Sequence, residues 1–211
     1  ESKEYATLLV CNELFGGSIM RNSVEITRKY QIGNMIVQHL FAAFVSIVFE
    51  LVACWYFLDK PVARYIVAAV FTVVYAGMLY SRAHKLASFD KKSYTPLQPE
   101  LKWGFIWGLC ISATMAFAII VFRLNWMLFS DGTSMNNVFS SFINILFYIW
   151  TAPYFGFISD IGGVIPVFAM ILMVLVPIAA SALGYVAGVN DFDILAKLDS
   201  MTVEKDTDDE E

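Results

Sequence analysis

The sequence predicts an all-α protein that crosses a lipid bilayer several times as a bundle of helices. Of its 211 residues, 58% are apolar and only 16% are charged, with a mean hydropathy of +0.63. A soluble domain carries about 25% charged residues. A soluble chain of this size buries only about 70% of its unfolded surface. With this many apolar residues, large apolar patches would therefore remain exposed to water. The same figures exclude disordered, collagen-like and disulfide-rich classes.

Five apolar segments are long enough to cross about 30 Å of hydrocarbon, which takes about 20 helical residues. We expect them at 36–58, 62–81, 103–122, 138–158 and 164–189. The first two are separated by Asp59-Lys60-Pro61. A proline at a helix start favours a tight helical hairpin there. The fifth segment would be about 39 Å long as a helix, so we expect it to tilt, or to kink at Pro166 or Pro177.

The fourth segment, 138–158, leaves two arrangements open. It contains several polar and helix-breaking residues, namely Ser140, Ser141, Asn144, Thr151, Pro153 and Gly156. Such a composition suits a broken helix that is held against protein. Its length is nevertheless sufficient for a crossing. The sequence therefore predicts either five crossings, or four crossings with a re-entrant fourth segment.

We divide the chain into an N-terminal segment at 1–35, a transmembrane domain at 36–189 and an acidic tail at 190–211. The segment at 5–20 is too short to cross and is expected to lie at the interface. Lys and Arg concentrate before the first span and in the loop at 82–102: Lys3, Arg21, Arg28, Lys29, Arg82, Lys85, Lys91, Lys92 and Lys102. Cytoplasmic loops collect such residues. We therefore expect a multi-pass protein of the cell membrane, with the N-terminus and this loop in the cytoplasm.

Small residues recur every four positions along two of the predicted spans. They are Gly104, Gly108 and Ser112 in the third, and Ala180, Gly184 and Gly188 in the fifth. Helices associate in membranes through close packing of small residues. The pattern predicts tight helix packing, against another span of this chain or against another subunit.

Glu50 is the ionisable side chain placed deepest in a predicted span. A charged carboxylate at the bilayer centre costs about 2.5–3.5 kcal/mol on insertion scales. His39 and Ser46 share its helix face, and Asn144 and Tyr148 belong to a polar stripe in the fourth segment. Together these residues form a candidate intramembrane polar or ion site. The alternatives are a protonated Glu50 with a structural role and a stripe that only bonds neighbouring helices.

Other signals point away from catalysis. No metalloprotease, nucleophile-elbow, phosphate-loop or dinucleotide motif occurs. We expect no enzyme activity, no metal, no cofactor and no binding of nucleic acid. The expected partners are the lipid bilayer and other membrane subunits or further copies of the chain. Aromatic residues near the span ends, including Trp150 and Tyr154, are expected to form a belt at the headgroups.

The helical hairpin followed by a basic loop, and the final span ending in PIAASALGYVAG (Pro177–Gly188), resemble small uncharacterised polytopic membrane proteins of Gram-positive bacteria. The likeness covers about the last third of the chain. It implies a multi-pass fold and no particular activity. Those proteins usually end in a basic tail, whereas 206–211 is acidic, so the resemblance does not orient the tail.

The leading functional hypothesis is a non-enzymatic subunit of a larger membrane complex concerned with transport. The alternative is a self-contained small channel or secondary transporter that uses Glu50. A third class, a substrate-capturing component that docks on an energising module, would require a cavity.

Overall fold

The computed structural model describes residues 17–56, 60–92, 97–129, 134–158 and 165–192, and it is all-α over these ranges. The all-α prediction is thereby confirmed. In chain order the elements are α2 (Gly17–Tyr56), α3 (Pro61–Asp90), α4 (Lys102–Phe129), α5 (Ser134–Trp150), the short 3-10 helix η2 (Ala152–Tyr154), α6 (Phe155–Ile158) and α7 (Val167–Val189).

Helices α2, α3, α4 and α7 are each long and apolar enough to cross a membrane. Three of them are longer than the apolar pattern predicts, among them α4, which continues to Phe129 instead of ending at residue 122. Helix α2 begins at Gly17 instead of residue 36, and α3 continues to Asp90 instead of ending at residue 81. The reason is that the polar extensions pack on each other, with Arg28 of α2 bonded to Asp90. Residues 5–16 of the predicted interfacial segment and 193–211 of the tail lie outside the described ranges.

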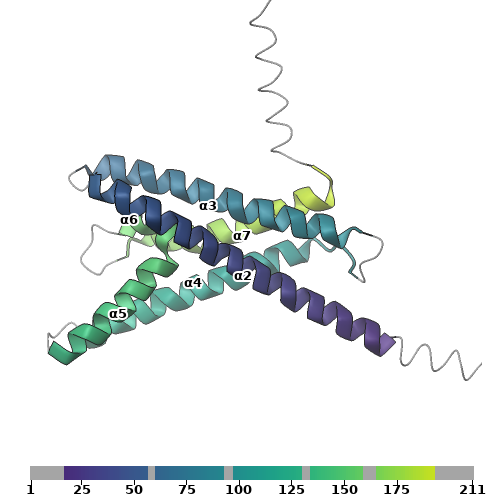
Figure 1. The fold of residues 1–211 in the computed structure, drawn as a ribbon, viewed down its shortest axis with the longest axis horizontal. Coiled ribbons are helices and arrows are strands. Elements are labelled where there is room, and N and C mark those ends of the chain that lie inside the picture. The colour runs from purple at the N-terminus through teal and green to yellow at the C-terminus, as the bar shows by residue number, and fades with distance from the viewer. Residues whose placement is uncertain (1–16, 57–59, 93–96, 130–133, 159–164, 193–211) are drawn as a thin grey trace, which may run out of the picture.

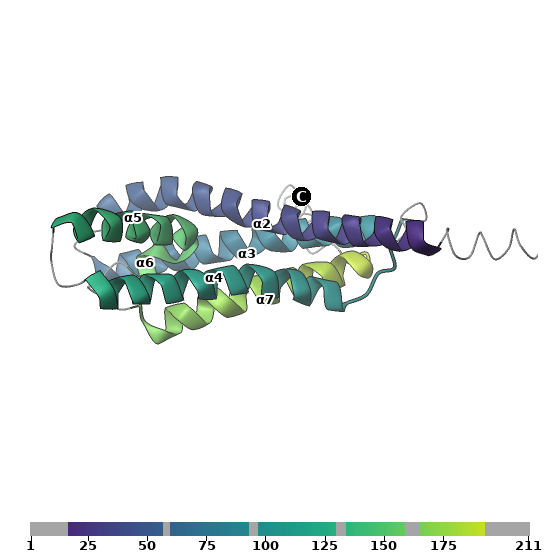
Figure 2. The same ribbon diagram turned by 90° about the horizontal axis from the view of Figure 1, so that it is seen from below.

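The contacts between helices establish their relative directions. Helix α2 is antiparallel to α3, because His39 meets Tyr75 and Asn34 meets Arg82. Helix α7 is antiparallel to α4 and parallel to α3, as shown by the close pairs Gly104–Tyr185, Gly108–Ile178, Gly184–Tyr80 and Gly188–His84. Helix α4 therefore ends at the end of the bundle where α7 begins (Figures 1 and 2).

The segment between α4 and α7 thus leaves and rejoins the same end of the bundle. Its two halves, Val138–Trp150 and Ala152–Ile158, are bent by 80°. Pro153 explains the break, since its nitrogen cannot donate the next helical hydrogen bond. Of the two arrangements predicted for the fourth segment, this geometry favours four crossings with a re-entrant pair (Figure 1).

Helix α7 lies between α3 and α4 and approaches both at glycine positions. A Cβ atom on Gly108 would lie 2.5 Å from the Cα of Ile178, and one on Gly184 would lie 2.4 Å from the carbonyl oxygen of Tyr80. Ser112, one turn beyond Gly108, donates a hydrogen bond to the carbonyl of Val174 at 2.7 Å. The small-residue pattern of α4 and α7 is therefore used within the chain.

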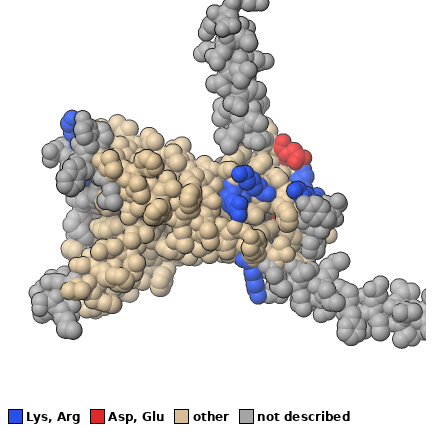
Figure 3. All heavy atoms as spheres, viewed as in Figure 1, with Lys and Arg blue, Asp and Glu red and all other residues tan. Residues whose placement is uncertain are grey.

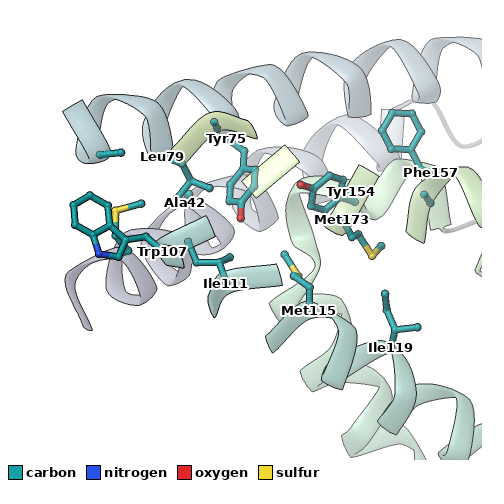
Figure 4. Packing of buried hydrophobic residues seen from close by; sticks show 14 of the residues in the cluster. Ala42, Tyr75, Leu79, Trp107, Ile111, Met115, Ile119, Tyr154, Phe157 and Met173 are labelled. Carbon is teal, nitrogen blue, oxygen red and sulfur yellow. The ribbon is translucent and has the colours of Figure 1, made fainter. Parts of the chain in front are cut away.

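Large buried side chains fill the space around these contacts. Tyr75, Trp107 and Tyr185 are 0% exposed, and the cluster continues along α4 through Ile111, Met115 and Ile119. Figure 4 shows Tyr75 of α3 and Tyr154 of η2 entering this same cluster. The re-entrant pair is therefore part of the core of the bundle.

Replacing Gly108 by Ala should destabilise the protein, because the added methyl would overlap backbone atoms of α7. Such overpacking costs about 1–3 kcal/mol. We expect a lower midpoint of thermal unfolding in mild detergent. Gly33→Ala and Gly77→Ala are matched controls, since nothing lies within 4 Å of a Cβ at either site. Equal stability of all three variants would contradict the close approach.

Single cysteines in a background without native cysteines should report the number of crossings. With four crossings, Lys92→Cys and Asn190→Cys react with a membrane-impermeant reagent from the same side, and Lys60→Cys reacts from the other. A fifth crossing would place residue 190 on the same side of the membrane as residue 60. Labelling of intact cells and of inverted vesicles distinguishes the two results.

Candidate functional site

A group of polar and aromatic side chains from four elements, α2, α3, α5 and η2, meets inside the bundle. It consists of His39 of α2, Tyr75 of α3, and Trp150 and Tyr154 of the re-entrant pair, and we call it the His39 cluster. Nδ1 of His39 lies 2.9 Å from the hydroxyl oxygen of Tyr75. The ring centroid of His39 is 5.1 Å from that of Trp150, and the rings of Tyr75 and Tyr154 meet edge to face at 5.8 Å.

The His39 cluster lies deep in the apolar part of the bundle. Along α3, Tyr75 follows Arg64 by eleven residues and precedes Arg82 by seven. At 1.5 Å per residue, it is about 16 Å from the level of one arginine and about 10 Å from the other. His39, Tyr75 and Tyr154 are each 0% exposed. The cluster is therefore far from both polar surfaces.

Three buried polar atoms of the cluster have no hydrogen-bond partner within the described residues. They are Nε2 of His39, Nε1 of Trp150 and the hydroxyl oxygen of Tyr154. A buried polar group left unsatisfied costs about 1–3 kcal/mol. Three such groups in adjoining side chains leave hydrogen-bonding capacity for polar atoms from outside the chain.

A groove of about 810 Å³ runs along the surface beside the cluster, between α2, α4 and α5. Sites for small molecules usually measure about 300–1,000 Å³. Its lining is almost entirely apolar and includes Leu40, Phe117, Val121, Phe147 and Trp150. Trp150 thus lines the groove and also contacts His39. Trp150 is therefore the residue that the groove and the His39 cluster share.

The residues predicted for an intramembrane site do not all come together. His39 and Ser46 are buried on the inner face of α2. Oδ1 of Asn144 accepts a hydrogen bond from Asn125 of α4 at 3.0 Å, and the ring of Tyr148 contacts that of Phe122. These two residues of the stripe thus bind α5 to α4. The side chain of Glu50 lies outside the described residues.

The sequence analysis missed Tyr75, and it placed Trp150 and Tyr154 wrongly in a belt at the headgroups. Tyr154 is fully buried, and Trp150 lies against His39. The re-entrant turn is the cause, because it carries the middle of the fourth segment to the interior instead of to the opposite surface. The sequence Thr-Ala-Pro-Tyr at 151–154 is the signal that marks this turn.

A second polar group, the Asp90 cluster, connects the ends of four helices. Nη1 of Arg28 lies 2.5 Å from Oδ2 of Asp90, and Nε2 of Gln31 donates to Oδ1 of Asp90 at 2.6 Å. The hydroxyl of Tyr185 donates to Asp90 at 3.0 Å, and the guanidinium of Arg28 lies 4.5 Å from the ring centroid of Trp103. Every charge here is paired, which indicates a structural role.

The length and apolar composition of the helices define the class of protein. It is a multi-pass α-helical membrane protein whose described part combines four membrane-length helices with a re-entrant pair. No group of three or more His, Cys, Asp or Glu residues in that part is arranged to hold a metal ion. No protein-family model, curated protein or solved structure matches the chain.

Replacing Asp90 by Asn should destabilise the protein strongly, because the buried Arg28 would lose its counter-charge. Removing one partner of a buried ion pair costs about 3–5 kcal/mol. Asp191→Asn is the matched control, since Asp191 forms an exposed pair with Lys91. Exposed pairs contribute about 0–1 kcal/mol. The midpoint of thermal unfolding in detergent is measured for both variants. An equal decrease in the two midpoints would rule out a special role for Asp90.

Proposed function

We propose that this chain is a membrane transport protein that binds a small solute at the His39 cluster. The observation that supports this proposal is that one group of adjoining side chains holds three unpaired polar atoms, on His39, Trp150 and Tyr154, beside a groove on the surface of the bundle. Polar side chains inside a membrane are costly and commonly mark the path or binding site of a substrate.

The backbone of the re-entrant pair supports the same proposal. Irregular backbone at membrane depth is tolerated where protein buries it or where it lines a cavity. Broken helices form the substrate sites of many transporters, near the middle of the bilayer. Here the break at 151–154 carries Tyr154 to the edge of the Tyr75 ring, beside its hydrogen bond with His39. The break thus supplies one of the three unpaired atoms.

The side chains of the cluster indicate the chemistry of the solute. The indole N–H of Trp150 donates only, while the hydroxyl of Tyr154 donates or accepts. The cluster holds no Asp, Glu, Lys or Arg, and burying an unpaired charge in such a place would be costly. We therefore expect a neutral, largely apolar solute with at least one hydrogen-bond acceptor, whose apolar part lies in the groove.

The orientation that we propose places the Asp90 end of the bundle in the cytoplasm. Among the described side chains, seven Lys and Arg lie at that end and three at the other: Arg28, Lys29, Arg82, Lys85, Lys91, Lys92 and Lys102 against Lys60, Arg64 and Arg123. Positive residues are retained on the cytoplasmic side. Figure 3 shows the blue side chains gathered mostly over the half of the molecule where α3 ends.

Membership of a larger transport complex is the second candidate. The groove between α2, α4 and α5 favours it, because its apolar lining and volume of about 810 Å³ would also accept side chains of a partner's membrane helix. The small-residue contacts of α4 and α7 do not bear on it, since the chain uses them internally. Both candidates assign the protein to transport.

The first experiment identifies the solute. Protein purified in mild detergent is denatured, and the released small molecules are analysed by mass spectrometry. Uptake of the compound found is then measured in proteoliposomes. Tyr154→Phe should lower its affinity about 2–10-fold, because one hydrogen bond contributes about 0.5–1.5 kcal/mol. Tyr65→Phe is the matched control, as Tyr65 stacks on Phe157 away from the cluster.

Two results decide between the candidates. Uptake by the purified chain alone, weakened by Tyr154→Phe and unaffected by Tyr65→Phe, supports a self-contained transporter. A foreign membrane protein that co-purifies in native mass spectrometry, and without which no uptake occurs, supports the complex. A chain that releases no small molecule and has no partner would contradict the proposal.

A further inference from the structure

The outer surface of α2 and α3 carries a polar pocket that is separate from the His39 cluster. We call it the Arg82 pocket. It has a volume of about 260 Å³ and is lined by Gln38, Gly77, Met78, Ser81, Arg82 and Lys85. Because a water molecule occupies about 30 Å³ in the liquid, the pocket has room for a group much larger than one water.

The two cations of the pocket are not neutralised. Nη2 of Arg82 donates to Oδ1 of Asn34, a neutral amide, and Nε of Arg82 is buried without a hydrogen-bond partner among the described residues. Lys85 forms no ion pair in that part of the chain either. Among the residues that the structure describes, no Asp or Glu lines the pocket. Two positive charges therefore face a polar space whose described lining holds no carboxylate.

The arginine is held in a way that suits an anion with several oxygens. A guanidinium presents five N–H donors in a planar fork, and pairs with carboxylate or phosphate through two of them. The bond to Asn34 uses one donor on the side of α2 and leaves others for a ligand. Lys85 lies three residues later on α3, so that the two side chains are neighbours on one helix face. Ser81 and Gln38 add neutral polar groups.

The depth of the pocket identifies the source of the anion. Arg82 follows Arg64 by 18 residues on α3, which is about 27 Å of helix. The hydrocarbon of a bilayer is about 30 Å thick, so Arg82 lies where acyl chains meet headgroups. Gly77 and Met78 lie about one turn deeper on the same helix, and nothing stands within 4 Å of a Cβ on Gly77. The pocket thus has a cationic rim and an open, weakly polar inner side.

We propose that the Arg82 pocket binds the headgroup phosphate of an anionic phospholipid. The phosphate pairs with Arg82 and Lys85, the glycerol region lies near Ser81 and Gln38, and an acyl chain passes over Gly77. Basic pockets between membrane helices bind anionic headgroups on the cytoplasmic side. The occupant is a lipid and not a soluble phosphate compound, because the site lies at membrane depth on the outer surface of the bundle.

Native mass spectrometry in mild detergent tests this proposal through the number of lipids that the protein retains. The probes are phosphatidylglycerol, phosphatidylcholine and inorganic phosphate. We expect the wild type to retain phosphatidylglycerol in preference to phosphatidylcholine. Arg82→Gln combined with Lys85→Gln should weaken that binding about tenfold or more, because both cations that attract the anionic headgroup are removed. Lys91→Gln combined with Lys92→Gln is the control of equal charge.

A second pair of variants removes the space without changing the charge. Gly77→Leu fills the inner side of the pocket, while Gly33→Leu adds the same side chain to α2 outside it. Both glycines have open space around them, so both variants should fold. We expect Gly77→Leu to lose phosphatidylglycerol and Gly33→Leu to keep it.

Three results would overturn the proposal. The first is equal retention of the two lipids by the wild type. The second is equal loss of phosphatidylglycerol in the Arg82/Lys85 and Lys91/Lys92 variants, which would mean that only the charge of this end matters. The third is displacement of the lipid by millimolar inorganic phosphate, which would make the site one for a soluble anion. None of these results depends on solute uptake, so the transport proposal is tested separately.

Discussion

The close approach of α7 to both α3 and α4 is the constraint on which the rest of the structure depends. Backbones meet at Gly104 and Gly108 on one side of α7 and at Gly184 and Gly188 on the other. In lipid, helices gain little from the hydrophobic effect and associate by packing and hydrogen bonds, so contacts of this kind determine which helices are neighbours. They also make α7 antiparallel to α4, and this direction forces the intervening segment to return.

The returning segment creates the polar interior. A helix that crossed straight through would keep its backbone hydrogen bonds internal and send its aromatic residues to the surfaces. The break at 151–154 is compensated locally, because Thr151 bonds the carbonyl of Phe147 and Thr72 of α3 donates to the carbonyl of Pro153. The same break leaves Trp150 against His39 and buries Tyr154 against Tyr75, with polar atoms on both side chains that no described neighbour satisfies.

Two arginines at the basic end show how one residue type takes different roles. Arg28 is paired with Asp90, covered by Trp103 and closed off from solvent, so it connects helices. Arg82 is bonded to a neutral amide beside a polar pocket and keeps its charge available. The difference lies in the partner that α2 or α3 provides, since a carboxylate neutralises the cation and an amide does not.

The sequence by itself determined the class, the apolar segments and the small-residue faces, because composition and helical spacing are local properties. It placed His39 and Ser46 on one face of α2 for the same reason. Only the tertiary structure decided that 138–158 turns back, that Tyr75 meets both His39 and Tyr154, and that Asp90 pairs with Arg28. Those outcomes depend on which helices lie side by side and in which direction, and such contacts join residues that are far apart in the sequence, such as His39 and Tyr75 or Asp90 and Tyr185.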